Sequence, residues 1–181
     1  MKKFLTWLAA ILLASGLGIV VQAPASAAPY CGLTWGSLAK TGQDTGTASV
    51  TNVRTGQHYC FDRLVVDLNG PAVSYTVQYV PRIEQEGSGA VIPVRGGARL
   101  HISIKAPSYD QNGNPTYNPA DKAELSNVAG YQTFRQVVSA GSFEGYTSLG
   151  LGVRARLPFR VFTLAGPGPG SRLVIDVAHY W

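Results

Sequence analysis

Most of the chain alternates between apolar and polar residues with a period of two, and helical periodicity is scarce. Side chains of a β-strand point alternately to the two faces of a sheet, so this pattern is typical of half-buried strands. Many short strands, punctuated by Gly and Pro, predict an all-β sandwich or barrel. Six segments rich in β-branched or aromatic residues are the predicted strands: residues 63–68, 73–80, 99–105, 134–139, 159–164 and 172–177.

The polar stretches between these segments predict mostly loops. Residues 119–126, PADKAELS, are the single helix candidate, about two turns long with Pro119 near the start. Residues 110–121 place two Asp and two Asn at positions of a calcium loop, but Pro115 stands where such a loop needs Gly. We therefore expect a long polar loop there, without a metal ion.

One six-residue pattern occurs twice: RLVVDL at residues 63–68 returns as RLVIDV at residues 172–177. On a strand, each copy turns its first, third and fifth residues to one face and its second, fourth and sixth residues, all aliphatic, to the other. We expect the copies to occupy equivalent places in two similar half-sheets, which favours internal pseudo-symmetry. Their outward charges either form cross-strand ion pairs on a solvated surface or contact a ligand. These charged residues are Arg63, Asp67, Arg172 and Asp176.

The beginning of the chain predicts export. Lys2 and Lys3 precede an apolar run at residues 4–21 and a stretch rich in Ala, Ser and Pro, the order found in a secretory signal peptide. We predict a signal peptide over residues 1–27, cleaved after Ala27, and one mature domain over residues 28–181 without a transmembrane segment. An uncleaved anchor is less favoured, because the small residues at the exit fit a cleavage site.

The net charge and the two cysteines limit the classes of function that this chain can have. The formal net charge is +5, and it falls to +3 when Lys2 and Lys3 leave with the signal peptide. This charge is too small and scattered for a nucleic-acid-binding protein, but it favours adhesion to an anionic cell wall or membrane surface. Cys31 and Cys60 are expected to form a disulfide in an exported chain; the alternative is a thiol nucleophile beside His58.

The segments FDRLVVDLNGPAVSYTVQYV, LGLGVRARLPFRVFTL and SRLVIDVAH together resemble the AMIN-like domain of exported actinobacterial proteins. This domain is a relative of the AMIN module that accompanies cell-wall amidases and secretins. The resemblance extends from about Val53 to His179. It implies a two-sheet β-sandwich that binds peptidoglycan or localises partners at the envelope. It also implies a binding surface around Arg63, Asp67, Arg172 and Asp176.

Enzymatic signatures are weak. The three histidines lack the spacing of a zinc site, and no G-x-S-x-G motif is present, so we predict no catalytic residue, metal or cofactor. Residues 150–155, GLGVRA, match a dinucleotide fingerprint but precede an extended segment, so Gly150 and Gly152 are expected at a bulge or bend. Arg154 and Arg156, sharing one strand face near Arg160, form either a basic strip for wall polymers or an ordinary solvated surface.

Tyr75 and Tyr79 fall on one side of their predicted strand and suit either sugar stacking or packing, of which we expect packing. The sequence as a whole predicts a secreted, non-catalytic envelope module with at most one short helix. Its expected partner is peptidoglycan or an envelope protein. The alternative is a secreted β-sandwich that binds a protein, as an inhibitor or adhesin does.

Overall fold

The computed structural model describes residues 30–181; the predicted signal peptide, residues 1–27, and its cleavage site lie outside this range. A short 3₁₀ turn, η1 (Tyr30–Gly32), is followed by eleven strands. The strands are β1 (Lys40–Thr45), β2 (Val50–Gln57), β3 (Phe61–Leu68), β4 (Val73–Val80), β5 (Ile83–Glu84), β6 (Val91–Ile92), β7 (Ala98–Ile104), β8 (Phe134–Phe143), β9 (Tyr146–Val153), β10 (Phe159–Ala165) and β11 (Ser171–Ala178).

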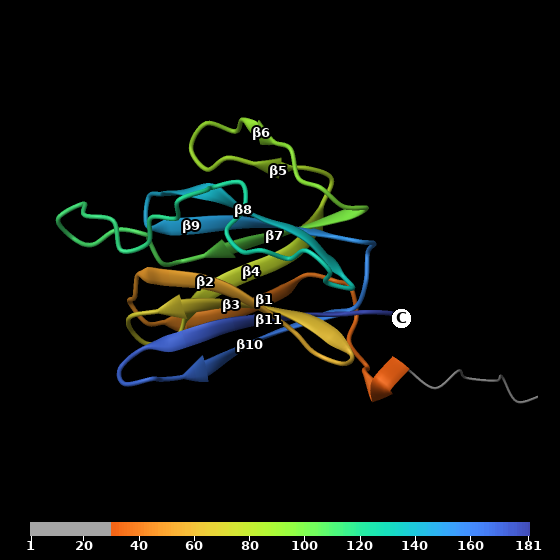
Figure 1. Cartoon of the computed structure of the whole chain (residues 1–181). Coiled ribbons are helices and arrows are strands. Elements are labelled where there is room, and N and C mark those ends of the chain that lie inside the picture. The colour runs from red at the N-terminus through yellow and green to blue at the C-terminus, as the bar shows by residue number, and fades with distance from the viewer. Residues whose placement is uncertain (1–29) are drawn as a thin grey trace, which may run out of the picture.

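Two antiparallel sheets form the two layers of a sandwich, one above the other in Figure 1. The five-stranded sheet has the order β1-β4-β7-β9-β8, and the four-stranded sheet has the order β10-β11-β3-β2. All six predicted strands are present, and the all-β sandwich prediction is confirmed. Of the nine strands in these two sheets, β1, β2 and β9 were not predicted, because β1 and β2 are polar and β9 contains two glycines. The two-residue strands β5 and β6 were not predicted either.

The core lies between the sheets and is built by the aliphatic side of each strand. Leu64, Val66 and Leu68 of β3 pack with the alternate residues of β11 in one continuous apolar cluster. Residues 100, 102 and 104 of β7 and 149, 151 and 153 of β9 supply the opposite layer. Tyr75 and Tyr79 pack against the edge of this cluster, as expected.

The small hairpin of β5 and β6 covers the outer face of the five-stranded sheet, at the top of Figure 1. Ile83 of the hairpin packs there against Val138 and Ala140 of β8. A Cβ atom at Gly150 would lie 2.9 Å from the Ile83 side chain, so only glycine allows this approach. The prediction of a bulge or bend at Gly150 and Gly152 was wrong: both lie within β9, and the irregular pairing is on β8.

The two copies of the repeated pattern do not occupy two half-sheets, which corrects that expectation. They are neighbouring antiparallel strands of one sheet, β3 and β11, in which Arg63 lies opposite Asp176 and Asp67 lies opposite Arg172. The symmetry is therefore a local two-fold relation centred on Val65 and Val174. In this register the first residue of each copy lies opposite the fifth residue of the other, which brings unlike charges together.

The predicted helix at residues 119–126 is absent, because the backbone there bonds to β8 instead of to itself. The Leu125 N–H donates to the Val137 carbonyl at 2.8 Å, and the Ser139 N–H donates to the Lys122 carbonyl at 2.8 Å. Residues 105–133 form a long excursion that runs along the edge strand of the five-stranded sheet. Tertiary hydrogen bonds outweigh the weak helical preference of so short a segment.

Candidate functional site

The outer face of the four-stranded sheet carries the charged residues of the repeat. At one end, the fully buried carboxylate of Asp176 accepts hydrogen bonds from two arginines. Arg63 of β3 donates from Nε at 2.6 Å and from Nη2 at 2.9 Å, one to each oxygen. Arg160 of β10 donates from Nε at 2.8 Å. The hydrogen bonds to Asp176 raise the pKa of Arg63.

Three aromatic rings surround this charged group. The Arg160 guanidinium lies 4.5 Å from the Trp35 ring centre and 4.9 Å from the Phe162 ring centre. The Arg63 guanidinium lies 5.2 Å from the ring centre of Phe61. Cation–π contacts and ring packing thus hold both guanidiniums in place. We call this group the Asp176 cluster, formed by Trp35, Phe61, Arg63, Arg160, Phe162 and Asp176.

Asp176 was expected to face the solvent, and this expectation was wrong. It lies on the outer face of the sheet, but the two arginines and the rings cover it, so no ligand reaches its oxygens. A buried carboxylate is stable only when it is paired and hydrogen-bonded, as it is here. The accessible groups of this cluster are the guanidiniums, with the Arg160 side chain 42% exposed, and the half-buried rings.

The other end of the β3–β11 ladder is arranged differently. Asp67 does not pair with Arg172; it binds Arg54 of β2, which donates from Nε at 2.8 Å and from Nη2 at 2.9 Å. Hydrogen bonding to Asp67 raises the pKa of Arg54. The Arg172 guanidinium donates to the Ala165 carbonyl at 3.0 Å, and its buried Nε has no partner among the described residues.

Arg154 and Arg156 lie in the turn between β9 and β10, at one end of the sandwich. They are not on a strand, which corrects the expectation of a shared strand face. Arg154 donates to the His179 carbonyl, and its guanidinium lies 5.3 Å from the Tyr180 ring centre. Arg156 donates to the Ser37 carbonyl at 3.1 Å. The six predicted site residues therefore fall on two surfaces.

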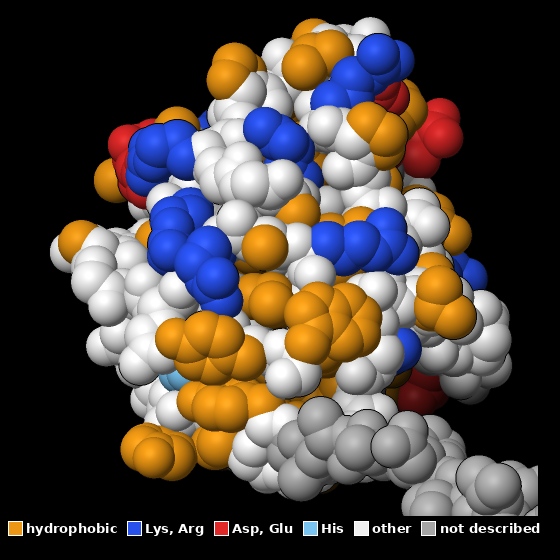
Figure 2. All heavy atoms as spheres, turned by 90° about the vertical axis from the view of Figure 1, so that its right-hand side faces the viewer, with side chains coloured by type: hydrophobic (Ala, Val, Ile, Leu, Met, Phe, Trp, Pro, Cys, Tyr) orange, Lys and Arg blue, Asp and Glu red, His pale blue; other side chains and the backbone are white. Residues whose placement is uncertain are grey.

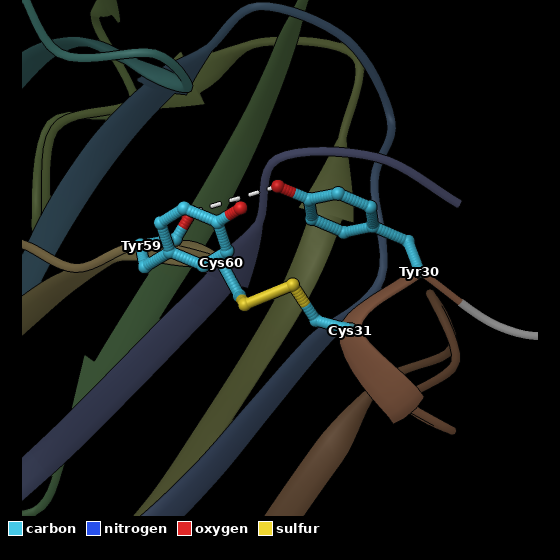
Figure 3. The surroundings of a disulfide bond; sticks show 4 residues. All are labelled: Tyr30, Cys31, Tyr59 and Cys60. Atoms are coloured by element: carbon cyan, nitrogen blue, oxygen red, sulfur yellow. Dashed lines mark hydrogen bonds between the residues drawn. A yellow bond between two sulfur atoms is a disulfide. The ribbon is translucent and has the colours of Figure 1, made fainter.

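The Cys31–Cys60 disulfide is confirmed and fixes the segment that carries Trp35. Figure 3 shows Cys31 joined to Cys60 beside the hydrogen bond from the Tyr30 hydroxyl to the Tyr59 carbonyl. Beyond Cys31 the chain crosses the end of the sheet, where the Gly36 carbonyl accepts the Phe159 N–H at 3.0 Å. Because Cys60 is oxidised, the alternative of a thiol nucleophile beside His58 is excluded for this state.

A buried polar pair ties the end of β11 to the chain before β8. The Asp62 carboxylate accepts the Thr133 N–H at 2.6 Å and the Phe134 N–H at 3.0 Å, and lies 3.2 Å from His179 Nε2. Asp62 and His179 are both buried. These contacts satisfy backbone donors, so the pair has a structural role.

Trp35, Phe61 and Phe162 were not predicted as site residues. Phe61 and Phe162 were detectable, since each lies two positions from an arginine on the same strand face: Phe61 from Arg63, and Phe162 from Arg160. Trp35 lies in a loop before β1, and no local signal connects it to Arg160. Its position depends on the disulfide and the path of the chain.

The described part of the chain offers neither a metal-binding group of three or more His, Cys, Asp and Glu nor a helix long and apolar enough to cross a membrane. The sequence model of the AMIN-like domain matches residues 48–179. The chain belongs to the AMIN-like domain family. None of the curated proteins matches the sequence.

The matched range includes eight of the nine strands of the two main sheets, all but β1. It also includes five of the six residues of the Asp176 cluster. Trp35 lies before the matched range, in the segment that the Cys31–Cys60 disulfide joins to the domain. AMIN-like domains are in general non-catalytic binding modules. Family membership and the disulfide are consistent with an extracellular or cell-wall-associated module.

Proposed function

We propose that this AMIN-like protein is exported, remains non-catalytic, and binds peptidoglycan through the outer face of the four-stranded sheet. The signal-peptide pattern at residues 1–27 supports export, and the family supports a role at the cell wall. The observation that carries the proposal is the Asp176 cluster, in which guanidiniums and half-buried rings lie side by side on one accessible face.

The cluster offers two kinds of contact that a wall polymer needs. Peptidoglycan combines sugar rings with peptide stems that carry carboxylates. The faces of aromatic side chains pack against the apolar sides of sugar rings. Guanidinium groups bind carboxylates through charge-assisted and often bidentate hydrogen bonds. The Arg160 guanidinium contacts both the Trp35 and the Phe162 ring, so the two chemistries lie side by side.

Charge supports an acidic ligand on this face. Arg63 and Arg160 share the single carboxylate of Asp176, which leaves one positive charge. At the other end of the ladder, Arg54 neutralises Asp67 and Arg172 remains without a carboxylate partner among residues 30–181. The face therefore carries an excess of positive charge, which attracts carboxylates and repels cations.

The test is co-sedimentation of the exported protein with purified wall sacculi. We expect the wild-type protein to sediment with sacculi and Arg160→Gln to lower the affinity about tenfold, the effect of losing one hydrogen bond to a charged group. Trp35→Ala is expected to lower it by a similar factor through the loss of stacking. Arg82→Gln removes the same charge from an exposed arginine paired with Glu84, and is expected to bind as wild type does.

Thermal unfolding of each variant checks that the domain is folded. A folded wild-type protein that stays in the supernatant contradicts wall binding and leaves the protein-binding alternative. Equal loss in Arg160→Gln and Arg82→Gln also contradicts the proposal, because it indicates unspecific attraction between charges. Competition by soluble muropeptides or by bare glycan strands then separates recognition of the stem from recognition of the sugar.

A further inference from the structure

Exposed aromatic and apolar side chains gather at one end of the sandwich. They are Leu38, Tyr59, Tyr180 and Trp181, which are 74%, 90%, 53% and 66% exposed. Figure 2 views this end, where apolar side chains lie next to several Lys and Arg side chains. Together with Arg154 and Arg156, these four residues form what we call the basic aromatic end.

A continuous set of contacts joins these residues into one surface. The Tyr30 ring packs edge-on against Tyr180 with 5.0 Å between centroids, and the Tyr30 hydroxyl donates to the Tyr59 carbonyl. The Trp181 indole N–H donates to the Arg156 carbonyl at 3.1 Å. Because the indole N–H is held by the backbone, the Trp181 ring is fixed while most of its surface remains in contact with water.

The two arginines of this end carry charge that no carboxylate of residues 30–181 neutralises. Arg154 donates to a backbone carbonyl, and Arg156 donates to the hydroxyl and carbonyl of Ser37. Arg63, by contrast, binds an aspartate. Exposed rings beside guanidiniums that lack a carboxylate partner in this range match the interface of an anionic bilayer, where Trp and Tyr lie at headgroup level and arginines bind lipid phosphates.

The sequence upstream leads to the same end. The apolar run at residues 4–21 is separated from Tyr30 by only eight residues, which span at most about 29 Å when fully extended. The Tyr30 ring contacts Tyr180, and Cys31 is disulfide-bonded to Cys60. The first described residues therefore lie at the basic aromatic end.

We propose that the basic aromatic end is a docking surface for an anionic lipid bilayer, distinct from the face proposed for peptidoglycan. Trp181 and Tyr59 insert their rings among the headgroups, and Arg154 and Arg156 bind lipid phosphates. Neither interaction requires the Asp176 cluster.

The test is flotation of the exported protein with vesicles of about 30% phosphatidylglycerol in phosphatidylcholine, compared with pure phosphatidylcholine. We expect binding to the anionic vesicles that weakens as salt rises. Arg154→Gln with Arg156→Gln is expected to reduce binding about fivefold for each arginine. Tyr59→Ser with Trp181→Ser, at positions that are largely exposed, is expected to abolish it without loss of folding.

The matched control is Lys105→Gln with Lys122→Gln, which removes two exposed charges elsewhere and is expected to bind as wild type does. Lack of vesicle binding by the folded protein, or equal loss in this control, would overturn the proposal. So would a Tyr59→Ser, Trp181→Ser variant that binds vesicles normally but no longer sediments with sacculi, since this end would then belong to the wall site. Arg160→Gln is expected to change only the sacculus assay, so the two proposals fail independently.

Discussion

Asp176 and Asp67 occupy equivalent positions in the two copies of one sequence pattern, yet their surroundings differ. Asp176 is fully buried and binds two arginines, whereas Asp67 is 23% exposed and binds one. The difference comes from the neighbouring strands. β10 places Arg160 beside Asp176 but Leu164 beside Arg172, and β2 places Gly56 beside Arg63 while its Arg54 reaches Asp67.

The cover over the two ends also differs. The segment after Cys31 brings Trp35 over Arg160, while nothing comparable among the described residues contacts Arg54. The pairing of the two copies determines which charged residues lie opposite each other. The surrounding strands determine how far each carboxylate is buried. A buried, doubly paired carboxylate and an exposed ion pair are therefore expected to differ several-fold in their contribution to stability.

The largest effect on stability is expected when the disulfide is removed, since it holds the segment that places Trp35 over Arg160. Cys31→Ser with Cys60→Ser is predicted to lower the free energy of unfolding by about 3.5 kcal/mol, because the bridge closes a loop with a sequence separation of 29 residues. Urea unfolding followed by tryptophan fluorescence measures this. An unchanged free energy would show that the Trp35 segment docks without help.

Next in size is a matched change of the two aspartates. Asp176→Asn is predicted to cost about 3 kcal/mol, because it leaves Arg63 and Arg160 partly buried without their carboxylate. Asp67→Asn, the same chemical change, is predicted to cost less than about 1 kcal/mol, as is usual for an exposed pair. Urea unfolding of both variants gives the difference, and equal costs would contradict the comparison.

The two arginines that share Asp176 are expected to be unequal. Arg63→Gln removes two hydrogen bonds from an arginine whose side chain is 24% exposed and is predicted to cost about 2 kcal/mol. Arg160→Gln is predicted to cost about 1 kcal/mol, since Arg160 contacts a single oxygen and is more exposed. If Arg160→Gln proves the more costly, cation–π contact with Trp35 and not the carboxylate holds the cluster together.

The smallest effect is expected at Arg172, the arginine of the repeat that lacks a carboxylate partner among residues 30–181. Arg172→Met is predicted to change the free energy of unfolding by less than about 0.5 kcal/mol. The substitution loses the hydrogen bond to the Ala165 carbonyl, but it also removes the cost of a buried Nε without a partner, and the two effects nearly cancel. Arg63→Met provides the matched comparison and is predicted to be clearly destabilising. A large loss in Arg172→Met would indicate a direct contribution from Asp67.

Much of the fold was predictable from local sequence. Alternation placed residues 73–80 and 172–177 on strands, and it predicted which side of residues 63–68 enters the core. The polar strand at residues 40–45 could not be predicted in this way, because an exposed edge strand needs little apolar surface. The predicted helix at residues 119–126 failed because hydrogen bonds to β8 determine its shape.

The candidate site was only partly predictable. Arg63 and Asp176 were both singled out from the sequence, and cross-strand ion pairing was one of the two expected roles, but the two residues were expected on separate half-sheets and facing the solvent. Their pairing depends on which strands become neighbours, and no local pattern decides that choice. Arg160 and Trp35 meet only because a disulfide and a long path of chain bring together residues far apart in the sequence.

The sequence by itself determined six of the nine strands of the two main sheets, the core-facing side of the repeat, the disulfide and the self-complementary order of Arg and Asp in the repeat. These features follow from side-chain alternation, oxidation chemistry and charge order, all of which act within or between short segments. Only the tertiary structure decided that the copies lie side by side and that one carboxylate is buried under two arginines. Burial and pairing depend on the surrounding strands, whose arrangement is set by the packing of the whole sandwich.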